Sequence, residues 1–191
     1  MNKPTEVVVL CEDDLTFRFT KRYLNKCGIA GIRPKISPRG CGYDFVINEF
    51  ANEVLAYRIA NARKKSWLIA VVDADTGTVA QRLGKMDKSL DKSNEQRVKD
   101  ISIENERIAR LIPRRNIETW LLALNNVSVN ENKDYKKEVA EFRHYDWDGS
   151  VLSASTTFYD LTRANAQRPE SLIPSLHHGI DEMRRVFQLA G

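Results

Sequence analysis

The chain has 191 residues, of which 42% are hydrophobic and 29% are charged, with a formal net charge of +4 at pH 7. These values are typical of a globular protein of one domain, or one domain with a small appendage, and they argue against a disordered or membrane-spanning chain. The first residues lack the apolar stretch of a signal peptide, so we expect a cytoplasmic protein with no membrane partner.

The first predicted element is a strand over residues 5–11, an apolar run without polar alternation, as in strands that are buried on both faces. Three carboxylates follow at once, beginning with Glu12. The spacing predicts a helix over residues 15–26 with Asp14 as its N-cap, ending at Gly28. A carboxylate therefore comes directly after a buried strand.

A second strand over residues 32–37 is expected at the edge of the sheet, because two prolines interrupt it. The next helix runs to about Lys64 and carries one apolar stripe, formed by Ile47, Phe50, Val54 and Tyr57. It leads to a strand over residues 67–72, and Asp73-Ala74-Asp75 follows that strand. This is the second place where carboxylates follow a buried strand.

Beyond Asp75, a polar turn predicts a helix beginning near Val79, and residues 87–99 are expected to form an exposed loop or a loose helix. A strand is predicted over residues 108–112, and Asn116 is expected to cap a helix through Leu124. The inward positions of that helix are Ile117, Trp120, Leu121 and Leu124. Residues 127–150 are polar and predict no clear element, and helices are expected over residues 153–164 and 175–189.

The alternation of strands and helices predicts an α/β fold of three layers with a mainly parallel sheet over residues 1–125. Residues 126–191 are expected to form a helical extension that packs on this domain or contacts a partner. In open α/β folds, ligands bind beyond the carboxyl ends of the strands. That is where both acidic clusters are predicted to lie.

Glu12, Asp73 and Asp75 are the candidate metal ligands. In extended chain, residues 73 and 75 lean to the same side and can share one cation. Hard oxygen ligands favour Mg²⁺ or Mn²⁺ over zinc, and two adjacent carboxylates repel each other without a cation. The alternative for Glu12 is a purely electrostatic role at the start of the following helix.

A third candidate cluster surrounds Glu118, which lies in the first turn of a predicted helix, just after Arg114 and Arg115. Glu118 can serve a second metal while an arginine holds a phosphate, or it can simply pair with its own arginines. Lys136 can neutralise charge in a transition state or lie on the surface. Arg39 belongs to a basic segment that suits a polyanionic partner.

Other catalytic chemistries have little support. Three cysteines without a C-x-x-C spacing argue against a zinc site or a disulfide framework. The three histidines match no H-E-x-x-H pattern, and there is no glycine-flanked serine of the hydrolase type.

A strand ending in Glu12, a later strand ending in Asp73-x-Asp75, and Glu118 near a helix start resemble the Toprim domain of topoisomerases, primases and overcoming-lysogenisation-defect nucleases. The resemblance covers residues 5–125 and is greatest to small stand-alone proteins of bacterial and phage-defence operons. It implies that Glu12 is a general acid/base or a metal ligand, that the two aspartates bind magnesium, and that Glu118 is an accessory ligand. Asp13 departs from the glycine that many members carry after the first glutamate.

With no strand-passage tyrosine domain and no zinc ribbon, the resemblance favours a Mg²⁺- or Mn²⁺-dependent nuclease that cleaves DNA or RNA in anti-phage defence. It also implies an ATPase partner in some operons. The expected catalytic residues are Glu12, Asp73, Asp75, Glu118 and Lys136, and the expected nucleic-acid contacts are Arg39, Arg114 and Arg115. Two alternatives stay open: a receiver-like signalling domain with Asp73 as phosphate acceptor, and a non-catalytic Toprim-like subunit of a larger complex.

Overall fold

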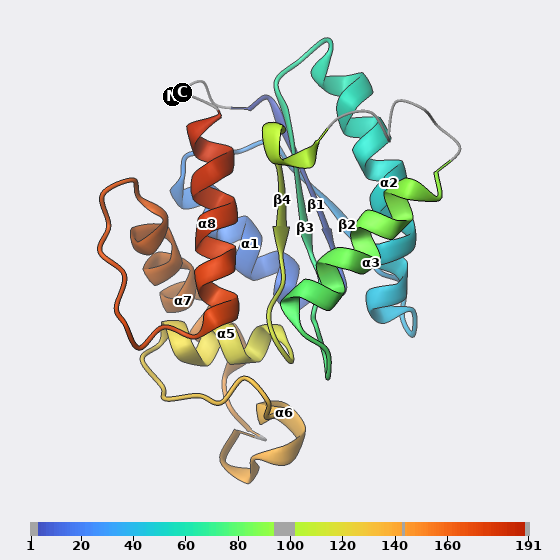
Figure 1. The fold of residues 1–191 in the computed structure, drawn as a ribbon. Helices are drawn as coiled ribbons and strands as arrows, with labels where there is room; N and C mark the ends of the chain where they lie inside the picture. Colours follow the sequence, from blue (N-terminus) through green and yellow to red (C-terminus); the bar gives the residue numbers. More distant parts are fainter. Residues whose placement is uncertain (1–3, 94–101, 143, 190–191) are drawn as a thin grey trace.

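The computed structural model describes residues 4–93, 102–142 and 144–189 (Figure 1). The described residues form a parallel four-stranded sheet in the order β2-β1-β3-β4. Its strands are β1 (Glu6–Cys11), β2 (Ile32–Ile36), β3 (Ser66–Val71) and β4 (Ile108–Leu111). The predicted α/β class with a parallel sheet is confirmed.

The strand β2 lies at an edge of this sheet, as its prolines predict. It pairs with β1 alone, and Pro34 lies opposite Val9 in the register. Proline has no N–H to donate, so a central position would leave a gap in the hydrogen bonding on one side.

Helices cover both faces of the sheet, which explains why the strands are apolar without alternation. Val9 and Ile69 point into one core with α1 (Asp14–Lys26), and Leu10 and Leu68 point into the other. Helices α7 (Trp147–Thr162) and α8 (Pro174–Gln188) share the face with α1, whereas α2 (Gly42–Asn61) and α3 (Val79–Asp91) cover the opposite face (Figure 1).

The helix α1 begins one residue earlier than expected, and its N-cap is Asp13 rather than Asp14. Asp13 has an extended backbone, and its Oδ1 accepts a hydrogen bond from the N–H of Thr16 at 2.8 Å. Asp14 is already helical and lies in the first turn. The Asp13 carboxylate is therefore tied to the start of α1, two residues after the end of β1.

The helix α3 continues to Asp91, so over residues 87–91 the structure has the helix rather than the exposed loop, the two alternatives predicted there. Thr78 and Gln81 form a reciprocal capping box at its start. Met86 and Leu90 are buried and face the sheet, which adds the packing that a charge-rich sequence does not reveal. The rest of the predicted loop, residues 94–99, lies outside the described residues.

The C-terminal third packs on the same core as α1. It contains α5 (Ile117–Leu124), α6 (Tyr135–Glu138), a short 3₁₀ turn at Ala140–Phe142, and then α7 and α8. Another 3₁₀ turn, Ile103–Asn105, precedes β4 and packs in the opposite core. Helix α7 begins at Trp147, earlier than the predicted residue 153, because Asp146 caps it by accepting from the Gly149 N–H. The ring of Phe187 lies 5.0 Å from that of Trp67 in β3. Within the described part of the chain, no helix is long and apolar enough to cross a bilayer.

Candidate functional site

The strand order reverses between β1 and β3, because the chain adds β2 on one side of β1 and then β3 and β4 on the other. Helix α1 leaves β1 toward one face, and α3 leaves β3 toward the other (Figure 1). Diverging connections leave a crevice beyond the two strand ends, and open α/β folds bind their ligands there. Glu12 follows β1 directly, and Asp73 is the second residue after β3.

Glu12 and Asp73 meet at this crevice, although they are far apart in the sequence. Oε1 of Glu12 accepts a hydrogen bond from the backbone N–H of Asp73 at 2.7 Å. The strand register brings this about, because Cys11 lies opposite Val71 and the two chains leave the sheet together. The predicted convergence of the two acidic clusters is therefore present in the structure.

A cavity of about 390 Å³, which we call the acidic pocket, opens beside this hydrogen bond. It is lined by Asp13, Asp73, Asp75, Thr76, Arg115, Asn116, Glu118, Asp134, Lys136 and Lys137. These residues come from the ends of β1, β3 and β4 and from the segment around α6. Glu12 borders the pocket through its hydrogen bond to Asp73.

The carboxylates of the site repel one another. Burial raises the pKa of Asp73 well above its ordinary value, and the negative charges of Glu12 and Glu118 raise it further. Burial also raises the pKa of Glu12 to about 7, against the opposing effect of the Asp73 N–H. Among the described residues, the Asp73 carboxylate forms no ion pair. A cation placed among these groups would relieve the repulsion.

Asp75 does not have the extended backbone assumed for the D-x-D pair. The strand β3 ends at Val71, and Asp75 has a left-handed backbone with φ of 53°. It forms a bridge with Arg115, which is also left-handed with φ of 71°. Such conformations are costly for residues other than glycine and cluster at functional sites.

The Asp75 carboxylate is paired with an arginine. Its Oδ2 accepts from Nη2 of Arg82 at 3.1 Å, and the Arg82 side chain is only 5% exposed. The extended backbone assumed for the pair Asp73 and Asp75 therefore does not continue through Asp75. Both still line the acidic pocket.

Glu118 is buried in the first turn of α5, behind the Asn116 N-cap. Its partner is Lys136 of α6, with Nζ 3.1 Å from Oε1, rather than its own neighbouring arginines. The nearby carboxylate raises the pKa of Lys136. The Lys136 side chain is 58% exposed, so its charge reaches the pocket from solvent.

The three predicted nucleic-acid arginines lie in different surroundings. Arg115 lines the acidic pocket and binds Glu138 at 2.9 Å. Arg114 donates to the side-chain oxygen of Asn132 at 2.7 Å and does not line the pocket. Arg39 is exposed in the segment after β2 and is also not part of the lining. Of the three, the structure places only Arg115 with the carboxylates.

Sequence reasoning missed Arg82, Asp134 and the pocket-lining position of Asp13. The sequence does contain a signal for Arg82, because this residue lies one turn into a capped helix that begins just after Asp75. Asp134 caps α6 and accepts from the side-chain amide of Asn116, which is itself a cap. Contacts between two caps depend on tertiary packing and leave no pattern in the sequence.

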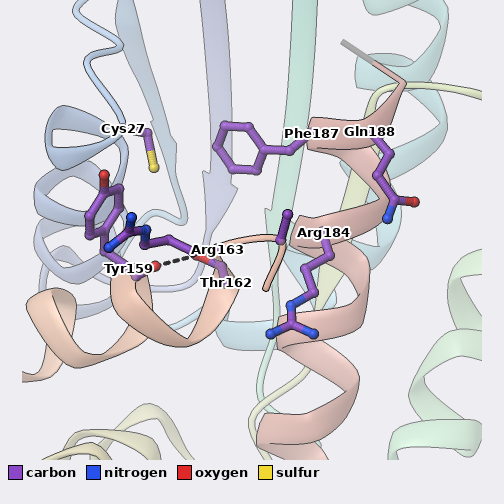
Figure 2. A pocket seen from close by; sticks show the side chains of 8 residues that line it. Cys27, Tyr159, Thr162, Arg163, Arg184, Phe187 and Gln188 are labelled. Carbon is purple, nitrogen blue, oxygen red and sulfur yellow. Dashed lines mark hydrogen bonds between the residues drawn. The ribbon is translucent and has the colours of Figure 1, made fainter. Parts of the chain in front are cut away.

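A second cavity, of about 500 Å³, lies between the end of α1 and the helices α7 and α8 (Figure 2). Its lining includes Cys27, Tyr159, Arg184 and Phe187. Burial raises the pKa of the Cys27 thiol to about 11, so at neutral pH the thiol is not a reactive nucleophile. The chemistry-bearing residues gather in the acidic pocket instead.

The donor types in the acidic pocket suit Mg²⁺. In the described ranges, no group of three or more His, Cys, Asp or Glu side chains is arranged as a metal cluster. Mg²⁺ is commonly held by one or two carboxylates, with waters and substrate phosphates as its other ligands. Glu12 and Asp73 together match that requirement.

Comparison of the chain with family models, curated proteins and solved structures found no match. The class of protein defined by fold and site is thus a three-layer α/β domain with an acidic pocket at the switch point of its sheet.

The pH dependence of stability follows from the raised pKa of Glu12. A carboxyl group whose pKa rises on folding, here from 4.5 to about 7, destabilises the fold increasingly as pH rises between these values. In metal-free buffer, we expect Glu12→Gln to be more stable than the wild type above pH 7, by up to about 3 kcal/mol, and to lose this advantage below pH 4.5.

Urea denaturation at several pH values measures this difference. The amide retains an oxygen that can accept from the Asp73 N–H, so the change removes the charge and keeps the hydrogen bond. Glu141→Gln on the exposed surface is the control and should follow the wild type. If the free energy of unfolding of Glu12→Gln changed with pH in the same way as that of the wild type, the prediction would be contradicted.

Proposed function

We propose that the protein is a Mg²⁺-dependent nuclease whose active site is the acidic pocket. The observation that carries the proposal is the meeting of Glu12 and Asp73 at the switch point, with Glu118 and Lys136 lining the same wall. The carboxylate of Asp73 has no cationic partner among the described residues, so the gathered carboxylates suit a divalent ion. A neighbouring lysine and arginine suit a phosphodiester.

Glu12 and Asp73 are the proposed ligands, with Asp75 and Glu118 around them. A metal bound there would polarise the scissile phosphate and supply a hydroxide at neutral pH. Oε1 of Glu12 accepts from the Asp73 N–H, which leaves Oε2 as the atom that would bind the metal or take a proton. Lys136 and Arg115 would hold a phosphate oxygen at the mouth of the pocket.

The test is a cleavage assay of the purified protein on single-stranded and duplex DNA and RNA, with Mg²⁺, Mn²⁺ or EDTA. We expect cleavage with either metal and none with EDTA, together with heat of Mg²⁺ binding in a calorimetric titration. Metal binding without cleavage of any substrate would contradict the nuclease proposal. Absence of metal binding would favour a non-catalytic subunit that retains the fold and docks a partner, such as the ATPase expected from the resemblance.

A receiver-like signalling domain is the second candidate, and the strand order favours it. The order β2-β1-β3-β4 is the beginning of the 2-1-3-4-5 order of flavodoxin-like folds, in which ligands bind at the switch point between β1 and β3. Asp73 would then be the phosphate acceptor. Addition of beryllium fluoride with Mg²⁺ should shift the amide spectrum of a receiver and leave a nuclease largely unchanged.

A further inference from the structure

A third cavity, which we call the basic cavity, adjoins the acidic pocket. It has a volume of about 530 Å³ and lies between the start of α2 and the first turns of α3. Tyr43, Arg82, Lys85 and Lys88 line it. Asp75 and Thr76 line both spaces, so the two cavities share one wall.

Positive charge in the basic cavity exceeds negative charge. Arg82, Lys85 and Lys88 face a single carboxylate, that of Asp75, which pairs with Arg82. Both lysines are exposed and form no ion pair within the described ranges. They lie three residues apart on one helix, where like charges repel each other. An anion bound between them would remove that repulsion.

Tyr43 holds these cations in place. The guanidinium of Arg82 lies 4.0 Å from the centre of the Tyr43 ring, and Nζ of Lys85 lies 4.9 Å from it. These are cation–π distances. Nη1 of Arg82 is buried and has no hydrogen-bond partner among the described residues, so this cation is oriented by the ring and by Asp75 alone.

Two of the three arginines predicted to bind nucleic acid already have partners of their own. Arg114 is hydrogen-bonded to Asn132, and Arg115 is paired with Glu138. The lysines of α3 are the unpaired cations that line a cavity next to the acidic pocket. A polyanion that places one phosphate in the acidic pocket can therefore extend its next phosphates over α3.

We infer that the basic cavity binds the phosphate backbone of a nucleic acid strand, with Lys85 and Lys88 contacting phosphates that flank the one in the acidic pocket. Tyr43 is a positioning residue, because it acts by orienting Arg82 and Lys85. The inference rests on the proposed function for the identity of the polyanion. Backbone contacts do not read bases, so binding here is expected to be independent of sequence.

The test measures the anisotropy of a fluorescein-labelled oligonucleotide in EDTA, where metal-dependent cleavage does not occur. The double substitution Lys85→Ala with Lys88→Ala should weaken binding about tenfold at low salt, since phosphate contacts supply most of such affinity. The slope of log K against log salt concentration should become shallower by about 2, one for each lost phosphate contact. Two oligonucleotides of unrelated sequence should behave alike.

The matched control is Lys21→Ala with Lys26→Ala on α1, which removes the same charge from the opposite face of the sheet. Both double variants lose the same net charge, so they lose the same non-specific attraction to the oligonucleotide. The affinity of the control should therefore stay within about twofold of the wild type. Tyr43→Leu should weaken binding, and Tyr43→Phe should restore it, since phenylalanine keeps the ring face. Inorganic phosphate as a competitor should displace the oligonucleotide only weakly.

The outcomes separate this inference from the proposed nuclease. Equal affinities of the two double-lysine variants, or no binding of the oligonucleotide by the wild type, would overturn the inference. If the wild type cleaves nucleic acid and the α3 variant binds it normally, the inference fails alone. If the α3 variant loses binding while no metal supports cleavage, the inference stands and the nuclease proposal fails.

Discussion

Asp73→Asn is expected to lower Mg²⁺-dependent cleavage by more than about a hundredfold, since loss of even an outer partner of a metal ligand costs about 10- to 100-fold. The same substitution should leave the metal-free protein at least as stable as the wild type. Burial and the charges of Glu12 and Glu118 oppose ionisation of Asp73, so a neutral isostere removes repulsion. Cleavage assays and urea denaturation in EDTA measure the two effects.

Asp91→Asn is the matched control, because Asp91 is the exposed last residue of α3 and undergoes the same chemical change. It should retain activity and stability. Loss of activity with retained or increased stability is typical of an active site, where residues needed for function lower the stability of the fold. Retained activity in Asp73→Asn would remove the proposed mechanism, and loss of folding would assign Asp73 a structural role instead.

Gly179→Ala is expected to be the most destabilising single-methyl change in the C-terminal helices. A Cβ at this position of α8 would lie 2.3 Å from Cη2 of Trp120, which is fully buried in α5. The indole cannot retreat easily, because its Nε1 donates to Oγ of Ser175 at 2.8 Å and Phe158 packs against its ring. Overpacking of this kind costs about 1–3 kcal/mol, and the gain of about 1 kcal/mol in helix propensity offsets part of that cost.

Gly84→Ala is the control for helix propensity, because Gly84 lies in α3 with nothing within 4 Å of the added Cβ. It should stabilise the protein by about 0.5–1 kcal/mol. Urea denaturation with unchanged m values for both variants gives the comparison. A Gly179→Ala variant as stable as the wild type would mean that α8 does not pack closely against α5.

The proposed site and the basic cavity together suggest how a substrate strand would lie. Asp75 belongs to both spaces and is paired with Arg82, so it separates the acidic pocket from the cations of α3. Its left-handed backbone turns the chain from β3 toward α3. Substitutions at Asp75 would therefore affect both spaces, which is why the experiments above change residues that belong to one of them.

Local patterns in the sequence determined most of the fold. Apolar runs without alternation identified the buried strands, prolines identified β2 as the edge strand, and the Asn116 cap with its apolar stripe identified α5. These signals depend on neighbouring residues alone. The predicted N-cap of α1 was wrong, because several adjacent carboxylates compete for one cap. The sequence left the end of α3 open between a loop and a helix, because the burial of Leu90 depends on the sheet beneath it.

The meeting of Glu12 with Asp73 also followed from the sequence, because both residues lie just beyond the carboxyl ends of neighbouring strands of one parallel sheet. Only the tertiary structure decided the partners of the site residues: Arg82 for Asp75, and Lys136 for Glu118. Ion pairs between distant segments depend on the path of the loops, here on left-handed turns at Asp75 and Arg115. A sequence carries no periodic signal for such turns when the residue is not glycine.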